Sequence, residues 1–509
     1  MRHFDFLNSV KKKLVLLLVL SFYFFSILSA RVMADDFGFD PSSPVGQLLA
    51  TAPENGWVKL NTNRYQDVWT PPGQRVLRVP PETGNVGPKA IIQAWSSMAW
   101  DSRRGDLIFF GGGHANYAGN DVYRWRASTL AWERASLPSA VEYTPLANDP
   151  WGRIFTSVGG VDDAPISAHT YDNSEYLPVV DRYVTFGGAA YGSGPFRKPD
   201  GQGGTVVTGP YFWDPGKGDP NKVGGATGTH VNPGQFPNVE GGSMWQNRDS
   251  VTKAAGLGGF SGSLLDGASA YATENGKDVL YLQARRKLFK YTVNDLDNPA
   301  ADTYEQVGRV TGTIGGQGAG AYAEDLNIFL RSFGGTENFT LWRLGNAGPA
   351  NDGIIFQPTV TGDTAFPLEK LGNYGLDYDP VRRQFVLWGG DDDVWALKPL
   401  DPSDLDGEWT LSLLVDETST DPAPSLEAAF PGTTQYFRGV LGKWKYSAAL
   451  DAFLGVVDPL SGDVWAYKPT NWQPQSVPLL SGFVYMLFPA GYLFFAGVKS
   501  RRLKSCAIK

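Results

Sequence analysis

The sequence SSMAWDSRRGDLIFFGGGHANYAGNDVYRW, residues 96–125, decides the fold, because its pattern recurs along the chain. Small residues come first, then a hydrophobic run that ends in Gly-Gly or another turn, then a run that contains an aromatic residue. A second clear copy is GLDYDPVRRQFVLWGGDDDVWALKP, residues 375–399. A repeat of roughly 50 residues indicates stacked or radially arranged units.

Six copies of this pattern predict an all-β protein. Each copy offers three or four short strands rich in Val, Phe, Tyr, Trp and Leu, separated by turns rich in Gly, Asp, Asn and Pro. Four-stranded sheets repeated around an axis form a β-propeller, so we expect six four-stranded blades. The copies lie at 96–137, 167–215 (first strand 167–172), 267–293, 318–344, 375–414 and 445–469.

The last copy lacks a fourth strand. The segment GWVKLNT, residues 56–62, alternates like a strand and resembles the outer strands LAWERASL (130–137) and GEWTLSLL (407–414). We therefore expect residues 56–62 to complete the last blade and close a propeller domain over residues 56–474, because closure removes exposed sheet edges. Residues 35–55 are predicted to be an irregular entry segment.

Composition limits the function. The formal net charge is −8, which gives no basis for binding nucleic acid. There is one cysteine, Cys506, so no disulfide can form within the chain, and there are four histidines. No phosphate loop, Gly-x-Ser-x-Gly elbow or HExxH motif occurs in the body. The sequence thus predicts no metal and no cofactor, and it identifies no catalytic residue. Acidic turns at 391–393 and 401–406 leave calcium binding open.

The two ends of the chain are predicted to be targeting segments. Residues 1–34 combine Lys11–Lys13, an apolar run and the small-residue site Val32-Met33-Ala34, as a secretory signal peptide does; an uncleaved anchor is the alternative. Residues 475–509 contain an apolar stretch, 482–498, followed by a basic cluster that ends at Lys504. Such a stretch can enter a bilayer with its basic end on the cytoplasmic side.

The tail resembles the PEP-CTERM family of sorting tails. This resemblance implies export to the membrane, cell surface or extracellular matrix of a Gram-negative bacterium that makes exopolysaccharide, with an exosortase as processing partner. The family's Val-Pro-Glu-Pro is Val-Pro-Leu-Leu here, from Val477 on, so anchoring is the firmer expectation, and an ordinary tail anchor is the alternative.

The repeats resemble kelch repeats, and among larger proteins the galactose-oxidase-type kelch propellers. Gly-Gly pairs at 111–112, 187–188, 334–335 and 389–390, each with a later Trp or Tyr, carry the resemblance over residues 90–470. Copper-radical oxidation is not expected, because enzymes of that kind need a Cys joined to a Tyr, and Cys506 lies in the tail. The tryptophans at 100, 125, 342, 395 and 465 are expected to pack between blades.

Candidate binding residues lie in loops on one face. In an antiparallel meander, the entry to strand one and the turn between strands two and three share a face. Long loops on a rigid scaffold commonly bind ligands, although a packed, structural role is the alternative for each histidine. The binding residues predicted on this basis are His114, Asn116, Tyr117, Asp162, Asp163 and His169.

The function predicted from these features is a non-enzymatic binding protein for a glycan, a matrix polymer or a surface protein. The alternatives are a metal-free carbohydrate-active enzyme, such as a mutarotase, lyase or hydrolase, and a structural matrix component. Paired carboxylates that converge on a pocket would favour the enzyme. A wide face with exposed aromatic residues would favour the binder.

Overall fold

A computed structural model describes residues 37–475, with gaps at 76–86, 115, 148–152, 193, 229–237, 251–265, 285, 310–315, 334–338, 345–354, 357–358, 416–421 and 433–436. The predicted signal peptide and sorting tail lie outside these residues. Within the described ranges, no helix is both long enough and apolar enough to cross a membrane.

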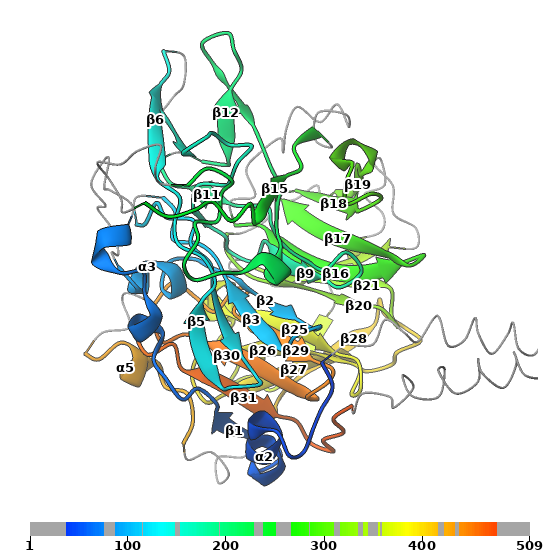
Figure 1. The fold of residues 1–509 in the computed structure, drawn as a ribbon. Helices are drawn as coiled ribbons and strands as arrows, with labels where there is room; N and C mark the ends of the chain where they lie inside the picture. The colour runs from blue at the N-terminus through cyan, green and yellow to red at the C-terminus, as the bar shows by residue number, and fades with distance from the viewer. Residues whose placement is uncertain are drawn as a thin grey trace, which may run out of the picture.

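Six antiparallel sheets surround one axis, as the sequence predicts (Figure 1). The first strand of each sheet packs against the first strands of the two neighbouring sheets, and this closes the ring. The first three blades are β2 (Met98–Asp101), β3 (Asp106–Phe109), β4 (Tyr123–Arg126) and β5 (Ala131–Arg134); β9 (Ser174–Leu177), β10 (Arg182–Thr185), β14 (Tyr211–Trp213) and β15 (Trp245–Asn247); and β16 (Ala268–Glu274), β17 (Lys277–Ala284), β18 (Lys287–Thr292) and β19 (Thr303–Arg309).

The other three blades follow the same order, with one additional strand in the fifth. They are β20 (Gly320–Ala323), β21 (Ile328–Ser332), β22 (Phe339–Arg343) and β23 (Ile355–Phe356); β25 (Gly375–Asp379), β26 (Gln384–Trp388), β27 (Val394–Pro399) and β28 (Glu408–Leu413), with β24 (Thr359–Gly362) parallel to β28; and β29 (Trp444–Ser447), β30 (Ala452–Val456), β31 (Val464–Lys468) and β1 (Gly56–Lys59).

The N-terminal strand closes the last blade, which confirms the prediction made for residues 56–62. β1 pairs antiparallel with β31, from Gly56 opposite Lys468 to Lys59 opposite Trp465. Trp57 is 3% exposed and lies 5.4 Å from the ring of Trp388 and 5.8 Å from that of Trp444. The closing strand is therefore anchored in the core between the fifth and sixth blades.

A common spacing defines the inner hairpin of every blade. An aromatic residue on the first strand is followed five residues later by a residue with positive φ, in the turn before the second strand. Left-handed backbone is easiest for Gly, Asn and Asp, and five of the six turn residues are of these types. The pairs are Trp100 with Gly105, Tyr176 with Asp181, Tyr271 with Gly276, Tyr322 with Asn327, Tyr378 with Arg383 and Tyr446 with Asp451.

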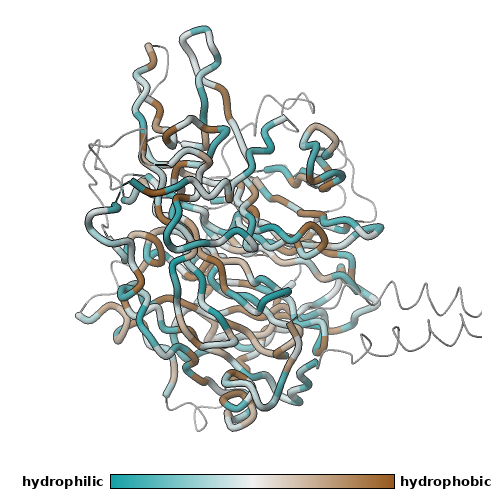
Figure 2. Tube along the Cα trace, in the orientation of Figure 1, coloured by the Kyte–Doolittle hydropathy of each residue, from teal (hydrophilic) through white to brown (hydrophobic). Residues whose placement is uncertain are grey.

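Hydrophobic residues follow the strands through the body, and hydrophilic segments occupy many of the turns (Figure 2). The buried clusters lie between neighbouring blades, and each mixes aromatic with branched aliphatic residues. Trp125, Trp342, Trp395 and Trp465 are at most 7% exposed, which confirms their predicted packing role. Trp100 differs, since it is only partly buried.

The second blade does not begin where the sequence reading placed it. Its first strand is β9, Ser174–Leu177, so the prediction of a first strand over 167–172 is wrong. Within that segment, β8 (Ala168–His169) pairs with β11 (Ala189–Ala190) in a separate small sheet. The physical reason is register: only Tyr176 stands five residues before the left-handed turn residue, Asp181, that opens the second strand.

Two hairpins project from one end of the molecule, and a short helix lies at the opposite end (Figure 1). The hairpins are β6 (Val141–Pro145) with β7 (Arg153–Ser157), and β12 (Arg197–Pro199) with β13 (Thr205–Val207). The helix α2 (Pro44–Thr51) lies within the entry segment predicted as irregular, and the Ser43 side chain caps it.

Among the described residues, the other helical segments are short, so helix contributes little to this part of the fold. They are α3 (Lys89–Ile92), α5 (Leu426–Ala429), η1 (Tyr65–Val68), η2 (Pro72–Gln74), η3 (Pro215–Lys217), η5 (Pro299–Ala301) and η8 (Leu368–Asn373).

Candidate functional site

An axial cavity of about 610 Å³ lies where the first strands of the six blades end. We call this side of the ring the hairpin face, because the turns between first and second strands lie on it. The opposite side, which carries the entries to the first strands, is the loop face. The sequence reading placed binding on the loop face, whereas this cavity belongs to the hairpin face.

Six aromatic side chains line the cavity, one from each blade. They are Trp100, Tyr176, Tyr271, Tyr322, Tyr378 and Tyr446. All are the first-strand residues that stand five positions before the left-handed turn, so the repeat itself places these side chains around the axis. We call these six residues the cavity aromatics. A position shared by six blades places one residue type around the whole axis.

The hydroxyl groups of the five tyrosines among the cavity aromatics form hydrogen bonds within the protein. Tyr176 and Tyr446 donate to Asp181 and Asp451 at 2.7 Å, and Tyr378 donates to Asp325 at 2.5 Å. The Tyr271 hydroxyl lies 2.6 Å from that of Thr273, and the Tyr322 hydroxyl donates to Asn327 at 3.4 Å. With their hydroxyls engaged, these residues offer mainly ring surface to a ligand.

Acidic side chains line the deeper part of the cavity beside one lysine. Glu175 from β9, Asp377 from β25 and Lys445 from β29 all line it, and each occupies the position before the aromatic residue of its strand. Lys445 Nζ donates to Glu175 Oε1 at 3.0 Å, and the Ser269 hydroxyl donates to the same oxygen at 3.1 Å. Asp377 accepts from the backbone N–H groups of Tyr378 and Tyr446.

Asp172 ties several blades together at the inner end of the cavity. Its Oδ2 accepts from Gly320 N–H at 2.8 Å, and its Oδ1 lies 3.7 Å from Lys445 Nζ. Its backbone carbonyl accepts from both the N–H and the hydroxyl of Ser269. Asp172 is 1% exposed, so it fixes the floor of the site and is itself shielded from solvent.

These carboxyls are held in conditions that favour their neutral forms. Burial raises the pKa of Glu175 to about 7; Lys445 opposes this shift, and Asp172 and Asp377 add to it. Burial likewise raises the pKa of Asp172 to about 6. Burial alone would lower the pKa of Lys445, but the three surrounding carboxyls raise it. Three acids thus share one ammonium group, which cannot fully neutralise them.

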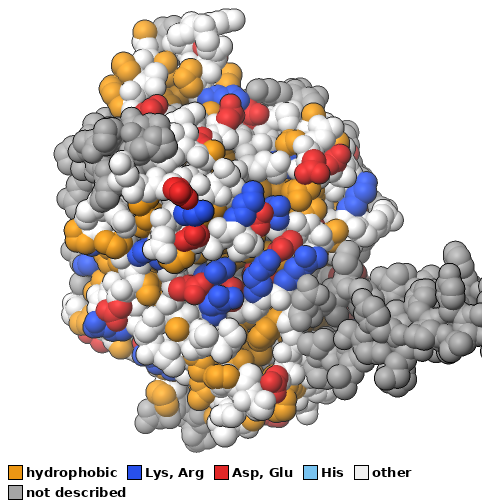
Figure 3. Space-filling model, in the orientation of Figure 1, with side chains coloured by type: hydrophobic (Ala, Val, Ile, Leu, Met, Phe, Trp, Pro, Cys, Tyr) orange, Lys and Arg blue, Asp and Glu red, His pale blue; other side chains and the backbone are white. Residues whose placement is uncertain are grey.

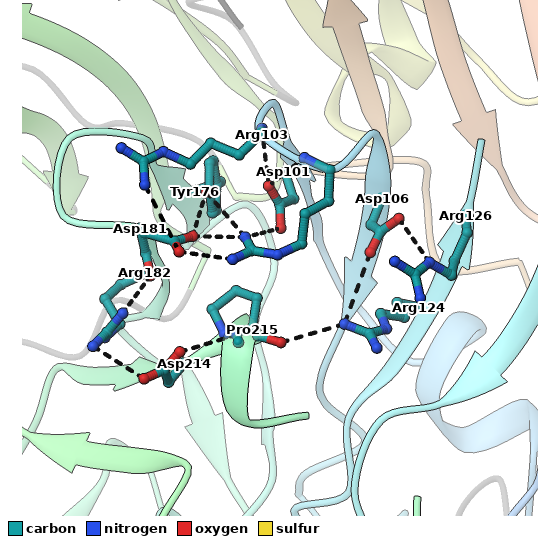
Figure 4. Close-up of polar contacts among 12 residues, drawn as sticks. Asp101, Arg103, Asp106, Arg124, Arg126, Tyr176, Asp181, Arg182, Asp214 and Pro215 are labelled. Atoms are coloured by element: carbon teal, nitrogen blue, oxygen red, sulfur yellow. Dashed lines mark hydrogen bonds and ion pairs between the residues drawn. The ribbon is translucent and has the colours of Figure 1, made fainter. Parts of the chain in front are cut away.

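A network of ion pairs braces the hairpin face around the cavity. Arg104 contacts Asp101 of its own turn at 2.9 Å and reaches Asp181 of the next blade at 2.6 Å. Asp181 also accepts from Tyr176, and Figure 4 shows Asp101, Tyr176 and Asp181 converging in this way. The contact links two neighbouring blades and fixes Tyr176, one of the cavity aromatics.

The same arrangement recurs between the fifth and sixth blades. Arg382 contacts Asp379 at 3.1 Å and Asp451 at 2.6 Å, and Asp451 accepts from Tyr446. The sequence signature is Asp-x-x-Arg, which the reading of the repeats missed. We call each contact between an Asp-x-x-Arg arginine and an aspartate of the next blade a blade latch.

On the molecular surface, basic and acidic side chains lie next to each other in a band across the face shown in Figure 3.

The loop face brings two of the predicted residues together. The rings of His114 and His169 lie 5.8 Å apart, and Trp95 packs edge-on against His169 at 5.0 Å. His114 is exposed, whereas His169 is 1% exposed, and burial lowers the pKa of His169 to about 3. His169 is therefore neutral at physiological pH.

The other predicted residues hold loops in place. Asn116 and Tyr117 are buried, and the Tyr117 ring lies 4.9 Å from that of Trp69. Asp162 is exposed and accepts from Asn247 at 3.1 Å. Asp163 accepts from the backbone of residues 226 and 227. Tyr117 thus holds the β3–β4 loop of the first blade, whereas Asp162 and Asp163 hold the segment before β8 against β15 and the loop that precedes it.

Within the described ranges, no three His, Cys, Asp or Glu side chains are grouped closely enough to hold a metal ion. Asp391, one of the acidic turn residues, accepts from Leu426 N–H at 2.7 Å. Cys506 lies outside the described residues.

The fold and the site define a class: a six-bladed β-propeller with an axial cavity lined by aromatic and acidic side chains. No protein-family model and no curated protein matches this chain. Among solved structures, it is similar to a major allergen of Malassezia sympodialis, Mala s 1 (10% identity, 76% of this chain and 96% of that one, TM-score 0.35).

Two further similar structures are carbohydrate-active enzymes. One is an α-L-arabinofuranosidase from Fusarium graminearum in complex with an iminosugar inhibitor (11% identity, 80% of this chain and 97% of that one, TM-score 0.36). The other is an α-L-arabinanase from Penicillium chrysogenum complexed with arabinobiose (10% identity, 80% and 98%, TM-score 0.32).

Proposed function

We propose that this protein binds a carbohydrate in its axial cavity. The observation that carries the proposal is the set of cavity aromatics above a floor of carboxyl groups, in a cavity of about 610 Å³. Sugars present apolar C–H faces that pack on aromatic rings and hydroxyl groups that donate to carboxylates. A volume of several hundred cubic ångströms is usual for a small-ligand site, and it suits a short stretch of a saccharide.

Binding without chemistry is the simpler function for this geometry. The oxygens of Asp377 accept backbone N–H groups, and Glu175 Oε1 accepts two donors. These contacts fix the carboxyls as parts of a rigid wall. Our proposal places the ligand in the axial cavity, and ligand contacts from the loop around His114 stay a prediction.

A second candidate, a metal-free carbohydrate-active enzyme, is favoured by one specific observation. Glu175, with its pKa raised to about 7, lines the same cavity as Asp377. A carboxyl group that holds a proton near neutral pH can act as a general acid towards a glycosidic oxygen, and a second carboxylate can assist.

The test is a glycan array followed by titration calorimetry with the saccharides that bind. We expect Tyr322→Ala to weaken binding about tenfold, or about 1.4 kcal/mol, because one stacking surface is lost. Tyr143→Ala is the matched control, since Tyr143 is 49% exposed on the distant hairpin β6–β7. Product formation from a bound saccharide, lost in Glu175→Gln, would instead establish the enzyme. Binding that survives Tyr322→Ala but is lost in His114→Ala would refute the axial site.

We also propose that the propeller belongs to the kelch-like group and that the chain is exported and held at a membrane by residues 482–498. The Gly-Gly repeats and the two terminal segments support this proposal. A chain that ends at Gln475 should then be released from the membrane fraction that retains the full chain. Retention of the shortened chain would contradict the assignment of the tail.

A further inference from the structure

The cavity wall carries more acid than base. Its acidic and basic residues are Glu175, Glu324, Asp325, Asp377 and Lys445. Asp325 is paired with Arg383 at 2.5 Å. This leaves three acids facing one lysine. Behind the floor, the buried Asp172 and Arg331 influence each other electrostatically and offset one another in charge.

The single lysine is not available to an anionic ligand. Lys445 is 7% exposed, and its ammonium group donates to Glu175 at 3.0 Å with Asp172 at 3.7 Å. A uronic acid or a sulfated sugar would have to displace these carboxyls while meeting Asp377 and Glu324. Like charges brought together in a partly desolvated site repel strongly.

The Glu175 carboxyl group is held by the protein through one of its two oxygens. Glu175 is 7% exposed, and Lys445 Nζ and the Ser269 hydroxyl both donate to its Oε1. The side chain lines the cavity. A carboxyl group in a cavity wall favours a ligand that brings an N–H or O–H group, and most of all a charged one.

The cavity aromatics also favour a positively charged ligand. The faces of Trp and Tyr rings carry negative potential and attract cations within about 6 Å of the ring centroid. Here six such residues surround the mouth of a site whose floor is acidic. Rings combined with carboxyl groups are the usual way in which proteins recognise an ammonium group.

We propose that the axial cavity selects a saccharide that carries a protonated amine, such as a glucosamine-containing polymer, over neutral and anionic saccharides. The proposal rests on the proposed function, carbohydrate binding. The ammonium group would lie against Glu175 and Asp377, and the sugar rings would pack on the aromatic residues above. Glu324 at the rim would add attraction that salt screens.

The test compares four probes by titration calorimetry with the full-length chain in detergent, at about pH 7. At this pH, Glu175 is about half ionised before a ligand binds, and an amine with a pKa like that of an α-amino group, about 7.7–8.0, is mostly charged. The probes are a β-1,4-linked glucosamine tetrasaccharide, its N-acetylated counterpart, tetragalacturonate, and tetramethylammonium chloride as a cation without a sugar. We expect the glucosamine tetrasaccharide to bind at least about tenfold more tightly than the N-acetylated one, and tetragalacturonate not to bind.

Two variants assign the selectivity to the cavity. Glu175→Gln keeps the size of the side chain and should remove most of the preference for the charged sugar. Glu142→Gln makes the same charge change on the exposed hairpin β6–β7 and should leave the preference intact. If Glu175→Gln fails to fold, Glu324→Gln at the exposed rim provides the second measurement, with a smaller loss of preference expected.

The outcomes separate this inference from the proposed function. Equal or tighter binding of the N-acetylated tetrasaccharide, or tighter binding of tetragalacturonate, overturns the selection for a cation and leaves carbohydrate binding standing. If no saccharide binds here or on the array, the proposed function fails. In that case, saturable binding of tetramethylammonium that Glu175→Gln abolishes would still support a cation site, and its absence would overturn both.

Discussion

Replacing Trp57 with alanine tests how the ring is closed. Trp57 lies on the N-terminal strand, is 3% exposed, and packs against Trp388, Trp444 and Tyr467 with ring centroids 5.4–5.8 Å away. Its indole N–H donates to the carbonyl of Asp392 in the fifth blade at 2.8 Å. This one side chain therefore joins the closing strand to both the fifth and the sixth blades.

The expected cost of Trp57→Ala is large relative to the stability of a domain. Removal of a buried tryptophan costs about 3–5 kcal/mol in transfer and cavity terms. The carbonyl left without its donor adds roughly 1 kcal/mol. Folded domains are stable by only about 5–15 kcal/mol, so the free energy of unfolding should fall by about a quarter or more. Trp57→Phe, which keeps most of the packing, should cost less than half as much.

The assay is guanidinium unfolding followed by circular dichroism and by tryptophan fluorescence. Tyr143→Ala is the control, because a half-exposed aromatic on a projecting hairpin should change stability by no more than about 0.5 kcal/mol. A loss below about 1 kcal/mol for Trp57→Ala would refute the view that the N-terminal strand holds the ring closed.

Three further predictions concern pH, the blade latch and the loop face. Glu175 has a pKa of about 7 in the folded state and about 4.3 in the unfolded chain. The folded state therefore holds the proton more tightly. The stability that this group contributes is complete at low pH and is lost as the pH rises towards 7. Glu175→Gln should therefore flatten the fall in unfolding free energy between about pH 4 and 7, and an unchanged slope would contradict this interpretation. Arg104→Met should cost about 1–3 kcal/mol in urea unfolding, because Asp101, which is 0% exposed, loses its ion pair; a change below 0.5 kcal/mol, roughly the size of a surface effect, would argue against the latch. Gly113→Ala should lower the melting temperature by several degrees, since φ is +50° and a Cβ atom would meet the backbone of His169, whereas Gly73→Ala, with nothing within 4 Å, should not.

The architecture could be predicted because it depends on local sequence patterns. Strand-forming runs between Gly, Asn and Asp turns define the blades, and the missing last strand of the sixth copy pointed to residues 56–62. The first strand of the second blade was misplaced because two short segments, 167–172 and 174–177, both contain a tyrosine. Only the five-residue spacing from Tyr176 to Asp181 distinguishes them, and this spacing could have been found by aligning the copies.

The candidate site was harder to predict. The aromatic residue of each first strand is visible in the sequence, but Trp100 was assigned to the core, because a sequence does not say whether a side chain points between blades or into the axial cavity. Glu175, Asp377 and Lys445 come from three different blades and converge only when the ring is closed. The long loops drew the prediction to the loop face, where Tyr117 proves to be buried against Trp69.

The most direct test of carbohydrate binding in the axial cavity is titration calorimetry of a saccharide selected on the array, with the wild-type chain and with Tyr322→Ala. Tyr322 lines the cavity and is only partly buried, so its removal should weaken the affinity about tenfold with a single binding site retained. An affinity unchanged in Tyr322→Ala, for a variant that still unfolds cooperatively, would contradict the account.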